Sequence, residues 1–543
     1  MTAHVDQFAR RMLPPRELWP ELSAGEMRYP DRLNCAAELL DAMVVQGGGD
    51  RVALRFPGGS WTYRELLEHS NRIAHVLTRD LGLVPGNRVL LRGPNNPMMA
   101  ACWFAVLKAG GIVVCTMPLL RARELAYLIE KAQIGLALCD TRVVRELEQA
   151  AASAPLLRRI VEFGTDAAGS LDALTRSRPG SFTNVATAAD DVALIAFTSG
   201  TTGQAKGTMH FHRDVLAICD LFPRHVLRPS RDDIFCGSPP LAFTFGLGGL
   251  LLFPLRVGAS TVLLEQATPP QLLQGIQDFR ASVCFTAPTA YRAMAATASG
   301  FDLSSLKKCV SAGEHLPAAT FEKWRAATGL GIIDGIGSTE MLHIFISAAG
   351  DDIRAGSTGR AVPGYRARVI DGDGIEVPPG TIGHLAVQGP TGCRYLDDAE
   401  RQRAYVQNGW NLPGDSYRMD EEGYFWYQAR TDDLIVSSGY KISGPEVENA
   451  LLDHPSVSEC GVVGVPDEER GCIVKAFVVL RPGIGATEDM TKELQDFVKS
   501  QIAPYKYPRS IEFVSALPRT ETGKLQRFRL RGAPTSPGAG RVR

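Results

Sequence analysis

Short runs of apolar and β-branched residues alternate with helix-like patterns over about the first 430 residues. Residues 317–329, for example, carry apolar positions at helical spacing between two such runs. This alternation is typical of an α/β fold with largely parallel sheets, because parallel strands need a crossover connection. Several runs lead into loops rich in Gly, Ser and Thr, where sheets of this kind bind ligands. The expected strands are residues 88–93, 191–200, 260–265, 282–287 and 307–314.

The most apolar stretch of the chain, residues 98–120, is long enough to span a membrane. Lys108 and Gly110–Gly111 interrupt it, however, and Asn96 followed by Pro97 is typical of the start of a helix. We therefore expect a buried helix that ends at the glycine pair, a buried strand at 112–115, and no membrane span.

The pattern changes after about residue 430. Ser443 with Glu446 three residues later indicates a capped helix start. Two strand-like runs follow, at 459–465 and 471–480, and then a second helical pattern at 491–502. This order predicts a compact α+β unit with its own core. The expected divisions are a large domain at 1–430, a small mobile domain at 431–530 and a disordered tail at 531–543.

Composition excludes several classes of protein. The 543 residues carry a net charge of -1, which gives no electrostatic reason to expect a nucleic acid or an anionic membrane as partner. The eleven cysteines include no Cys-x-x-Cys pair, which favours reduced thiols over disulfides or a zinc site. The N-terminal residues lack the apolar core of a signal peptide, so a cytoplasmic protein is expected.

The stretch TSGTTGQAKG, residues 198–207, follows an expected strand. Its glycines allow the backbone to turn and expose N–H groups, its hydroxyls add donors, and its lysine adds charge, so it is suited to binding an anion. It is not a Walker loop, since Ala205 stands where the second glycine is required. Gly246–Leu247–Gly248 begins like a dinucleotide-binding fingerprint, but Leu251 stands where the third glycine of that fingerprint is required. An ordinary flexible linker remains the alternative.

The same stretch resembles the phosphate loop of the adenylate-forming superfamily, which includes acyl-CoA synthetases, adenylation domains of peptide synthetases, and luciferases. Five further motifs of that family follow in its order, and the resemblance covers about residues 50–528. The matching segments are Ser311–Ala312–Gly313–Glu314, Gly337–Ser338–Thr339–Glu340, Asp415, Arg430–Thr431–Asp432–Asp433, and Pro518 to Lys524.

The resemblance implies two half-reactions: a carboxylate attacks the α-phosphate of Mg²⁺-bound ATP, and a thiol, that of CoA, then attacks the acyl-adenylate. It implies that Glu340 binds Mg²⁺, that Asp415 binds the ribose, and that Lys524 stabilises the transition state. Arg430 and Thr198 are further catalytic candidates. The nucleotide-binding candidates are Thr198, Ser199, Gly200, Thr201, Thr202, Gly203, Lys206, Gly313, Glu314, Asp334, Gly335, Ile336, Gly337, Ser338, Thr339, Asp415, Arg430 and Lys524.

Each of these charged residues has a simpler interpretation. Asp415 fits a turn after Pro413, Glu340 fits a solvated position at a helix start, and Lys524 fits an exposed site near a basic tail.

The family also implies that the small domain rotates about Asp432 between the half-reactions. The segment from Ser438 and Gly439 to Tyr440 and Lys441 then lines the path of the thiol, where Gly439 permits close approach of a pantetheine chain.

Residues 334–345 resemble the benzoate-CoA ligase branch of the family, and the chain is most similar to 2-aminobenzoate-CoA ligases within it. The resemblance places His343 and Gly337 at the aryl pocket, although a hydrogen-bonded histidine inside a helix is the alternative for His343. Phe243, Thr244 and Phe245 are expected to flank an aromatic acid. Benzoate ligases often have Ala-Tyr-Gly where Thr244–Phe245–Gly246 stands here, which favours a substituted ring.

Two other patterns are given less weight. His210 and His212 share a face of an expected strand, but a third metal ligand is not evident. Residues 371–380 begin like a calcium loop, which Ile375 breaks, so a hairpin turn is expected.

The predicted function is that of an aryl-CoA ligase that uses ATP, Mg²⁺ and CoA. The alternatives are an adenylation enzyme that loads a carrier protein, and a non-catalytic nucleotide-binding regulator. A homodimer is compatible with either enzyme.

Overall fold

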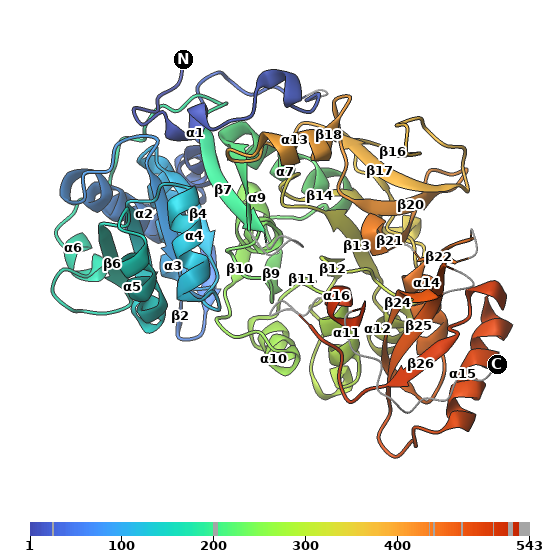
Figure 1. The fold of residues 1–543 in the computed structure, drawn as a ribbon. Helices are drawn as coiled ribbons and strands as arrows, with labels where there is room; N and C mark the ends of the chain where they lie inside the picture. Colours follow the sequence, from blue (N-terminus) through green and yellow to red (C-terminus); the bar gives the residue numbers. More distant parts are fainter. Residues whose placement is uncertain are drawn as a thin grey trace.

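The computed structural model describes residues 1–23, 27–198, 205–433, 435–437, 440–467, 471–502, 504–519 and 525–531. Figure 1 shows a large N-terminal part, coloured from blue to orange, and a small C-terminal part in orange and red that lies against one side of it. The fold is α/β, as predicted.

The central sheet has nine strands in the order β15-β14-β13-β12-β11-β9-β10-β1-β2. Its inner strands are parallel, and antiparallel pairs occur only towards its two edges. In chain order the strands are β1 (Val52–Phe56), β2 (Gly59–Thr62), β9 (Ile234–Gly237), β10 (Ser260–Val262), β11 (Val283–Thr286), β12 (Lys308–Ala312), β13 (Ile332–Gly337), β14 (Ile344–Ser347) and β15 (Arg360–Ala361).

A second sheet has six strands in the order β6-β5-β3-β4-β7-β8, and all its pairs are parallel except β7 with β8. Its strands are β3 (Arg88–Arg92), β4 (Ile112–Thr116), β5 (Leu136–Asp140), β6 (Arg159–Phe163), β7 (Val192–Thr198) and β8 (Lys206–Phe211).

Helices cover both faces of these two sheets, as parallel strands buried on both sides require. Val89 and Leu91 of β3 belong to a core that also contains β11 and β12 residues of the nine-stranded sheet, whereas Leu90 belongs to the core on the opposite face. The helices of the shared core are α2 (Tyr63–His75), α3 (Pro97–Lys108), α7 (His212–Asp220) and α9 (Phe253–Val257); the outer helices are α4 (Ala122–Lys131), α5 (Val144–Ser153), α10 (Pro269–Phe279), α11 (Pro288–Ala295) and α12 (Ala318–Thr328).

Helix α3 confirms the interpretation of the most apolar stretch. The Asn96 side chain accepts a hydrogen bond from the Met99 N–H, Pro97 occupies the first turn, and β4 follows after the glycine pair. Lys108 is fully buried in this helix and pairs with Asp41 at 2.6 Å. Among the described residues, no helix is long and apolar enough to cross a membrane.

A third sheet, which the alternating α/β pattern did not predict, is antiparallel throughout. It lies at the end of the large part of the chain, and the turn predicted at 371–380 connects its first two strands. Its elements are β16 (Arg366–Ile370), β17 (Ile382–Gln388), β18 (Val406–Gln407), β19 (Trp410–Asn411), β20 (Asp415–Met419), β21 (Phe425–Arg430) and the helix α13 (Ala399–Tyr405).

The small C-terminal part has its own hydrophobic core. The Ser443 hydroxyl caps α14 by accepting from the Glu446 N–H, as expected, whereas α15 begins at Glu488, earlier than predicted, because Thr487 caps it. Its elements are β22 (Ile435–Ser437), β23 (Tyr440–Ile442), α14 (Gly444–Leu452), β24 (Val457–Asp467), β25 (Gly471–Leu480), α15 (Glu488–Gln501), β26 (Ser510–Phe513) and α16 (Arg527–Arg531). The predicted tail lies outside the described residues after Arg531.

Candidate active site

Two of the predicted nucleotide-binding segments leave neighbouring parallel strands side by side. Ser311 of β12 and Asp334 of β13 are register partners, as are Ala312 and Gly335. Both strands run in the same direction, so β12 and β13 end at the same edge of the sheet. Gly313, which has φ +90°, follows β12 at that edge. The two motifs therefore meet at one edge of the sheet, although residues 315–333 separate them in the sequence.

Asp334 has an unusual environment at this edge. Its Oδ1 atom is buried and has no hydrogen-bond partner among the described residues. Burial raises the pKa of this carboxyl to about 8, and a hydrogen bond from the Gly335 backbone opposes the change only in part. Asp334 can therefore carry a proton at neutral pH, so that its side chain could either donate or accept a hydrogen bond.

Glu340 lies in the short connection between β13 and the antiparallel strand β14. The alternative that Glu340 stands at a helix start is wrong, and so is the alternative that places His343 in a helix, because this segment forms turns. Leu342 has φ +70°, and a Cβ on Gly337 would lie 2.7 Å from the His343 backbone. The tight path of the turn explains why glycine is needed at Gly337.

The ends of the predicted phosphate loop belong to a β-hairpin. Thr198, the last residue of β7, is the register partner of Lys206, the first residue of β8. The loop residues Ser199, Gly200, Thr201, Thr202 and Gly203 lie outside the described residues. His210, farther along β8, is buried, and its Nε2 donates to the Thr339 carbonyl at 2.8 Å. The hairpin is therefore connected directly to the Glu340 turn.

Asp415 and Arg430 face each other across the antiparallel strands β20 and β21. Arg430 Nη1 lies 3.1 Å from Asp415 Oδ1 and donates to the Pro413 carbonyl at 2.9 Å. Asp415 does follow a turn, since Gly414 has φ +81°, but it also begins a strand and is almost fully buried. The two predicted residues are thus held as a pair at the end of the third sheet.

His343 lies in a cluster of aromatic rings. Its ring centroid is 4.5 Å from that of Phe253, 5.8 Å from Phe245 and 5.9 Å from Phe222. Burial lowers the pKa of His343 to about 3, so the imidazole is neutral. Its Nε2 lies 3.4 Å from the Phe245 carbonyl, which can only accept, and Nδ1 has no partner among the described residues.

The loop before Phe243 is held by a residue that the sequence did not single out. Asn95 accepts from the Leu241 N–H at 2.7 Å and donates to the Pro239 carbonyl at 3.0 Å. Phe243 then precedes the short helix α8 (Thr244–Leu247), which contains Thr244 and Phe245. The sequence signal for Asn95 is its place beside Asn96, directly before the helix that begins at Pro97.

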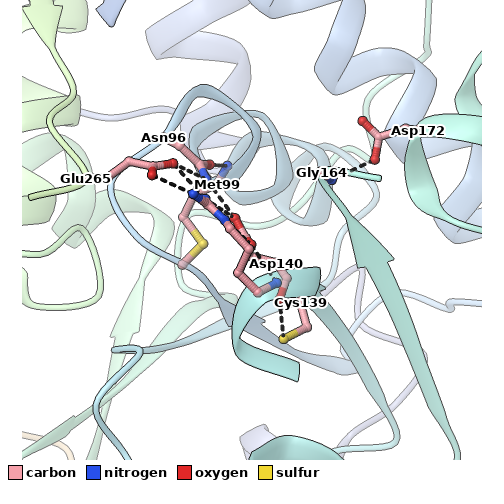
Figure 2. A network of polar contacts seen from close by, with 8 residues as sticks. Asn96, Met99, Cys139, Asp140, Gly164, Asp172 and Glu265 are labelled. Carbon is pink, nitrogen blue, oxygen red and sulfur yellow. Dashed lines mark hydrogen bonds and ion pairs between the residues drawn. The ribbon is translucent and has the colours of Figure 1, made fainter. Parts of the chain in front are cut away.

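Asn96 belongs to a polar network that connects the two parallel sheets (Figure 2). Its amide donates to Asp140 at 3.0 Å and to Glu265 at 3.3 Å. Arg142 contacts both carboxylates, at 2.7 Å from each. Because Asp140 ends β5 and Glu265 follows β10, this network fixes the start of α3, and with it Asn95, relative to both sheets.

Several predicted residues of the small part lie outside the described residues, namely Lys524, Ser438 and Gly439. Tyr440 and Lys441 are described only as backbone of β23, and Asp432 only as backbone of the turn Thr431–Asp433. The described residues on either side of Lys524 are close together, since Arg519 and Leu525 form an antiparallel bridge.

The small part contacts the large part close to the Gly313–Glu314 segment. Asn449 of α14 lies 3.5 Å from His315, whose ring stacks on Tyr427 at 5.2 Å. Arg292 of α11 pairs with Glu459 of β24 at 3.3 Å. These contacts place the small part beside the edge of the nine-stranded sheet at which the predicted motifs meet.

The donors at this edge suit a hard cation bound together with phosphates. Among the described residues, no three His, Cys, Asp or Glu side chains form a metal cluster, so His210 and His212 do not make one. Glu340 supplies one half-buried carboxylate beside the hydroxyls of Ser338 and Thr339. Mg²⁺ usually binds one or two protein carboxylates and takes its other oxygen ligands from phosphate and water. The residues present fit Mg²⁺ in that manner.

Comparison with known proteins agrees with this arrangement. Residues 42–394 match the model of the AMP-binding enzyme family, and residues 446–524 match that of the AMP-binding enzyme C-terminal domain. The benzoate–CoA ligase of Thauera aromatica is 36% identical over 512 residues, which cover 93% of this chain and 97% of that protein.

Two solved structures are similar over almost the whole chain. The anthranilate CoA ligase AuaEII, in complex with anthranoyl-AMP, superposes with a TM-score of 0.88 at 35% identity and covers 93% of this chain and 98% of its own. A benzoate CoA ligase from Burkholderia xenovorans gives a TM-score of 0.83 at 33% identity, with 92% and 99% covered. The chain therefore belongs to the AMP-binding enzyme family, in its aryl-CoA ligase branch, and is an AMP-forming acyl-CoA ligase.

Proposed function

We propose that the protein is an ATP-dependent aryl-CoA ligase whose preferred acid is of the 2-aminobenzoate type. The acid carboxylate attacks the α-phosphate of ATP, releasing pyrophosphate and forming an aryl-adenylate. The CoA thiol then attacks the aryl carbonyl carbon, and AMP leaves. Similarity to benzoate and anthranilate CoA ligases over more than nine-tenths of the chain supports this class of acid.

Residues of the large part bind and orient ATP in this proposal. Asp415 accepts hydrogen bonds from the ribose hydroxyls, while the adenine lies at the edge where Gly313 and Asp334 meet. The loop from Thr198 to Lys206 binds the β- and γ-phosphates through backbone N–H groups, hydroxyls and the lysine. Glu340 holds Mg²⁺, which, when bound, neutralises phosphate charge.

The small part, residues 431–530, supplies different residues to each half-reaction in this proposal. Lys524 places a positive charge where the acyl and phosphate oxygens meet during adenylation. Rotation about Asp432 then withdraws Lys524 and brings the segment from Ser438 to Lys441 to the thiol path. Arg430, at the end of the large part, remains close to Asp415 throughout.

The single observation that carries the choice of acid is the state of His343. A neutral imidazole that donates from Nε2 has a lone pair on Nδ1, which accepts hydrogen bonds. The Nδ1 atom of His343 is buried and has no hydrogen-bond partner among the described residues. The other edge of the ring, with Cδ2, packs against Gly248. A buried acceptor without a donor is unfavourable, and a ring amino group would supply the N–H that plain benzoate lacks.

The test measures AMP and pyrophosphate formation with benzoate, 2-aminobenzoate, 4-hydroxybenzoate, acetate and a medium-chain fatty acid, with and without CoA. We expect CoA-dependent turnover with the aromatic acids and the highest kcat/KM with 2-aminobenzoate. Replacement of His343 by Leu, a side chain without polar atoms, should lower the preference for 2-aminobenzoate over benzoate by roughly 2- to 10-fold, the value of one neutral hydrogen bond. An unchanged preference in His343→Leu would contradict the assignment.

The same panel separates the other functions. One equivalent of pyrophosphate without further turnover, despite added CoA, would identify a carrier protein as the acceptor. ATP binding without pyrophosphate release for any acid would identify a nucleotide-binding regulator.

A further inference from the structure

The turn that contains Glu340 is held by side chains from outside its own sheet. The Tyr405 hydroxyl lies 3.2 Å from the Ser338 hydroxyl, and the Thr391 hydroxyl donates to the Met341 carbonyl at 2.8 Å. His210 of β8 contacts the Thr339 carbonyl, as described above. The fourth contact is made to Glu340 itself, and it comes from Tyr395, whose hydroxyl donates to Oε1 at 2.7 Å.

Tyr395 belongs to a short segment that runs beside the phosphate-loop hairpin. The Met209 N–H donates to the Arg394 carbonyl, and the Leu396 N–H donates to the Gly207 carbonyl, both at 2.8 Å. Thr208 and Tyr395 form an antiparallel bridge between these two bonds. The backbone of Tyr395 is therefore fixed to β8 next to Lys206, at the base of the predicted phosphate loop.

The Tyr395 side chain has little freedom to move. It is 2% exposed, and its ring packs edge-on against Tyr405 with centroids 5.8 Å apart. A carboxylate oxygen can only accept, so the Tyr395 hydroxyl is the donor and Glu340 accepts from it.

We propose that Tyr395 is a positioning residue for the metal: by holding Oε1 of Glu340, it fixes the orientation of the carboxylate that would hold the Mg²⁺ accompanying ATP. The proposal rests on the proposed function, which assigns Mg²⁺ to Glu340. A carboxylate that ligates a metal is commonly oriented by a hydrogen bond from a neighbouring group, and loss of that group typically weakens metal binding by roughly 10- to 100-fold. Through its backbone, Tyr395 also places this carboxylate in register with the phosphate loop.

A matched pair of variants separates positioning from packing. Tyr395→Phe removes one hydroxyl and keeps the ring in its pocket. Tyr405→Phe removes the hydroxyl of the neighbouring ring, which contacts Ser338 rather than the carboxylate. If the hydroxyls served only to stabilise the turn, both variants would have similar effects.

The experiment measures binding of Mn²⁺, a paramagnetic substitute for Mg²⁺, by electron paramagnetic resonance in the presence of α,β-methylene-ATP, which cannot release pyrophosphate. Binding of the analogue without metal and thermal unfolding are measured alongside. We expect Tyr395→Phe to weaken Mn²⁺ binding by roughly 10- to 100-fold, with metal-free binding of the analogue and the unfolding temperature close to wild type. Tyr405→Phe should change Mn²⁺ affinity less than threefold, and Tyr395→Phe should add little to Glu340→Gln.

The other outcomes overturn different statements. If Glu340→Gln leaves Mn²⁺ affinity unchanged, the metal role in the proposed function fails, and the inference fails with it. If Glu340→Gln weakens binding but Tyr395→Phe does not, the inference alone is overturned. Equal losses in Tyr395→Phe and Tyr405→Phe would also overturn it, because they would show a general effect on the turn.

Discussion

Replacement of Gly248 by alanine should damage the proposed aryl pocket by displacing His343. Gly248 begins the helical turn Gly248–Leu252, and its φ of −62° and ψ of −59° are allowed for alanine. In such a conformation alanine normally stabilises a helix by about 0.5–1 kcal/mol relative to glycine. Here, however, the new Cβ would lie 2.4 Å from His343 Cδ2 and 2.6 Å from Nε2.

The size of the effect follows from this distance. Ordinary contact begins at 3.4 Å, so the imidazole must move by about 1 Å. The rings of Phe253 and Phe245 restrict that movement. Overpacking of this kind typically costs about 1–3 kcal/mol, which exceeds the helix gain. If the strain displaces the side chains that contact the acid, the kcat/KM for the aryl acid falls by roughly 5- to 140-fold, since about 1.4 kcal/mol is a factor of ten.

The assay measures initial rates of aryl-CoA formation over ranges of acid and ATP concentration, together with thermal unfolding. We expect a higher KM for the acid, an almost unchanged KM for ATP, and a lower unfolding temperature. Gly300→Ala is the control, because nothing lies within 4 Å of its added Cβ. A Gly248→Ala protein with wild-type acid kinetics and wild-type or higher stability would refute the reasoning, because it would show that His343 is not confined against this helix.

Three further changes test other parts of the structure. The pKa of Asp334 in the folded protein, about 8, is above its ordinary value of 3.8. The contribution of Asp334 to stability is therefore complete below about pH 4 and is lost as the pH rises towards 8. In Asp334→Asn the unfolding temperature of the ATP-free protein should not decline over that pH range. Asp214 and Arg394 are both 0% exposed and lie 2.7 Å apart. Asp214→Ala should therefore lower the free energy of unfolding, measured by urea denaturation, by about 3–5 kcal/mol, whereas the double variant Asp214→Leu with Arg394→Met should lower it much less. Arg292→Gln removes the ion pair with Glu459, which keeps its second partner Arg519. It should change the ratio of adenylation to thiol-transfer rates by about two- to fivefold, measured in single-turnover experiments, and an unchanged ratio would show that this contact does not bias the small domain.

The parallel sheets could be predicted from the sequence because their strands are buried on both faces and read as continuous apolar runs. The cap at Asn96 and the cap at Ser443 were equally local signals, and both are confirmed. The antiparallel third sheet was missed because its signals are weak. Strands β18 and β19 have two residues each, too short for an alternating pattern.

The order of the motifs in the sequence identified most of the candidate site, but not how its members contact one another. Glu340 and His343 lie in turns because strand β14 returns antiparallel to β13, and no local pattern marks that return. Tyr395 contacts Glu340 across 55 residues, so only the folded chain reveals the pair. Asn95 acts on a loop more than 140 residues away.

The contacts around Glu340 also set an order of events during synthesis. Every strand of the two parallel sheets lies before residue 362, so a growing chain that ends just before Thr391 already contains both sheets. Such a chain has His210 but lacks Thr391, Tyr395 and Tyr405, which make the other contacts to the Glu340 turn. The turn that holds the metal in the proposed function is therefore completed late on the ribosome, after both parallel sheets have been synthesised.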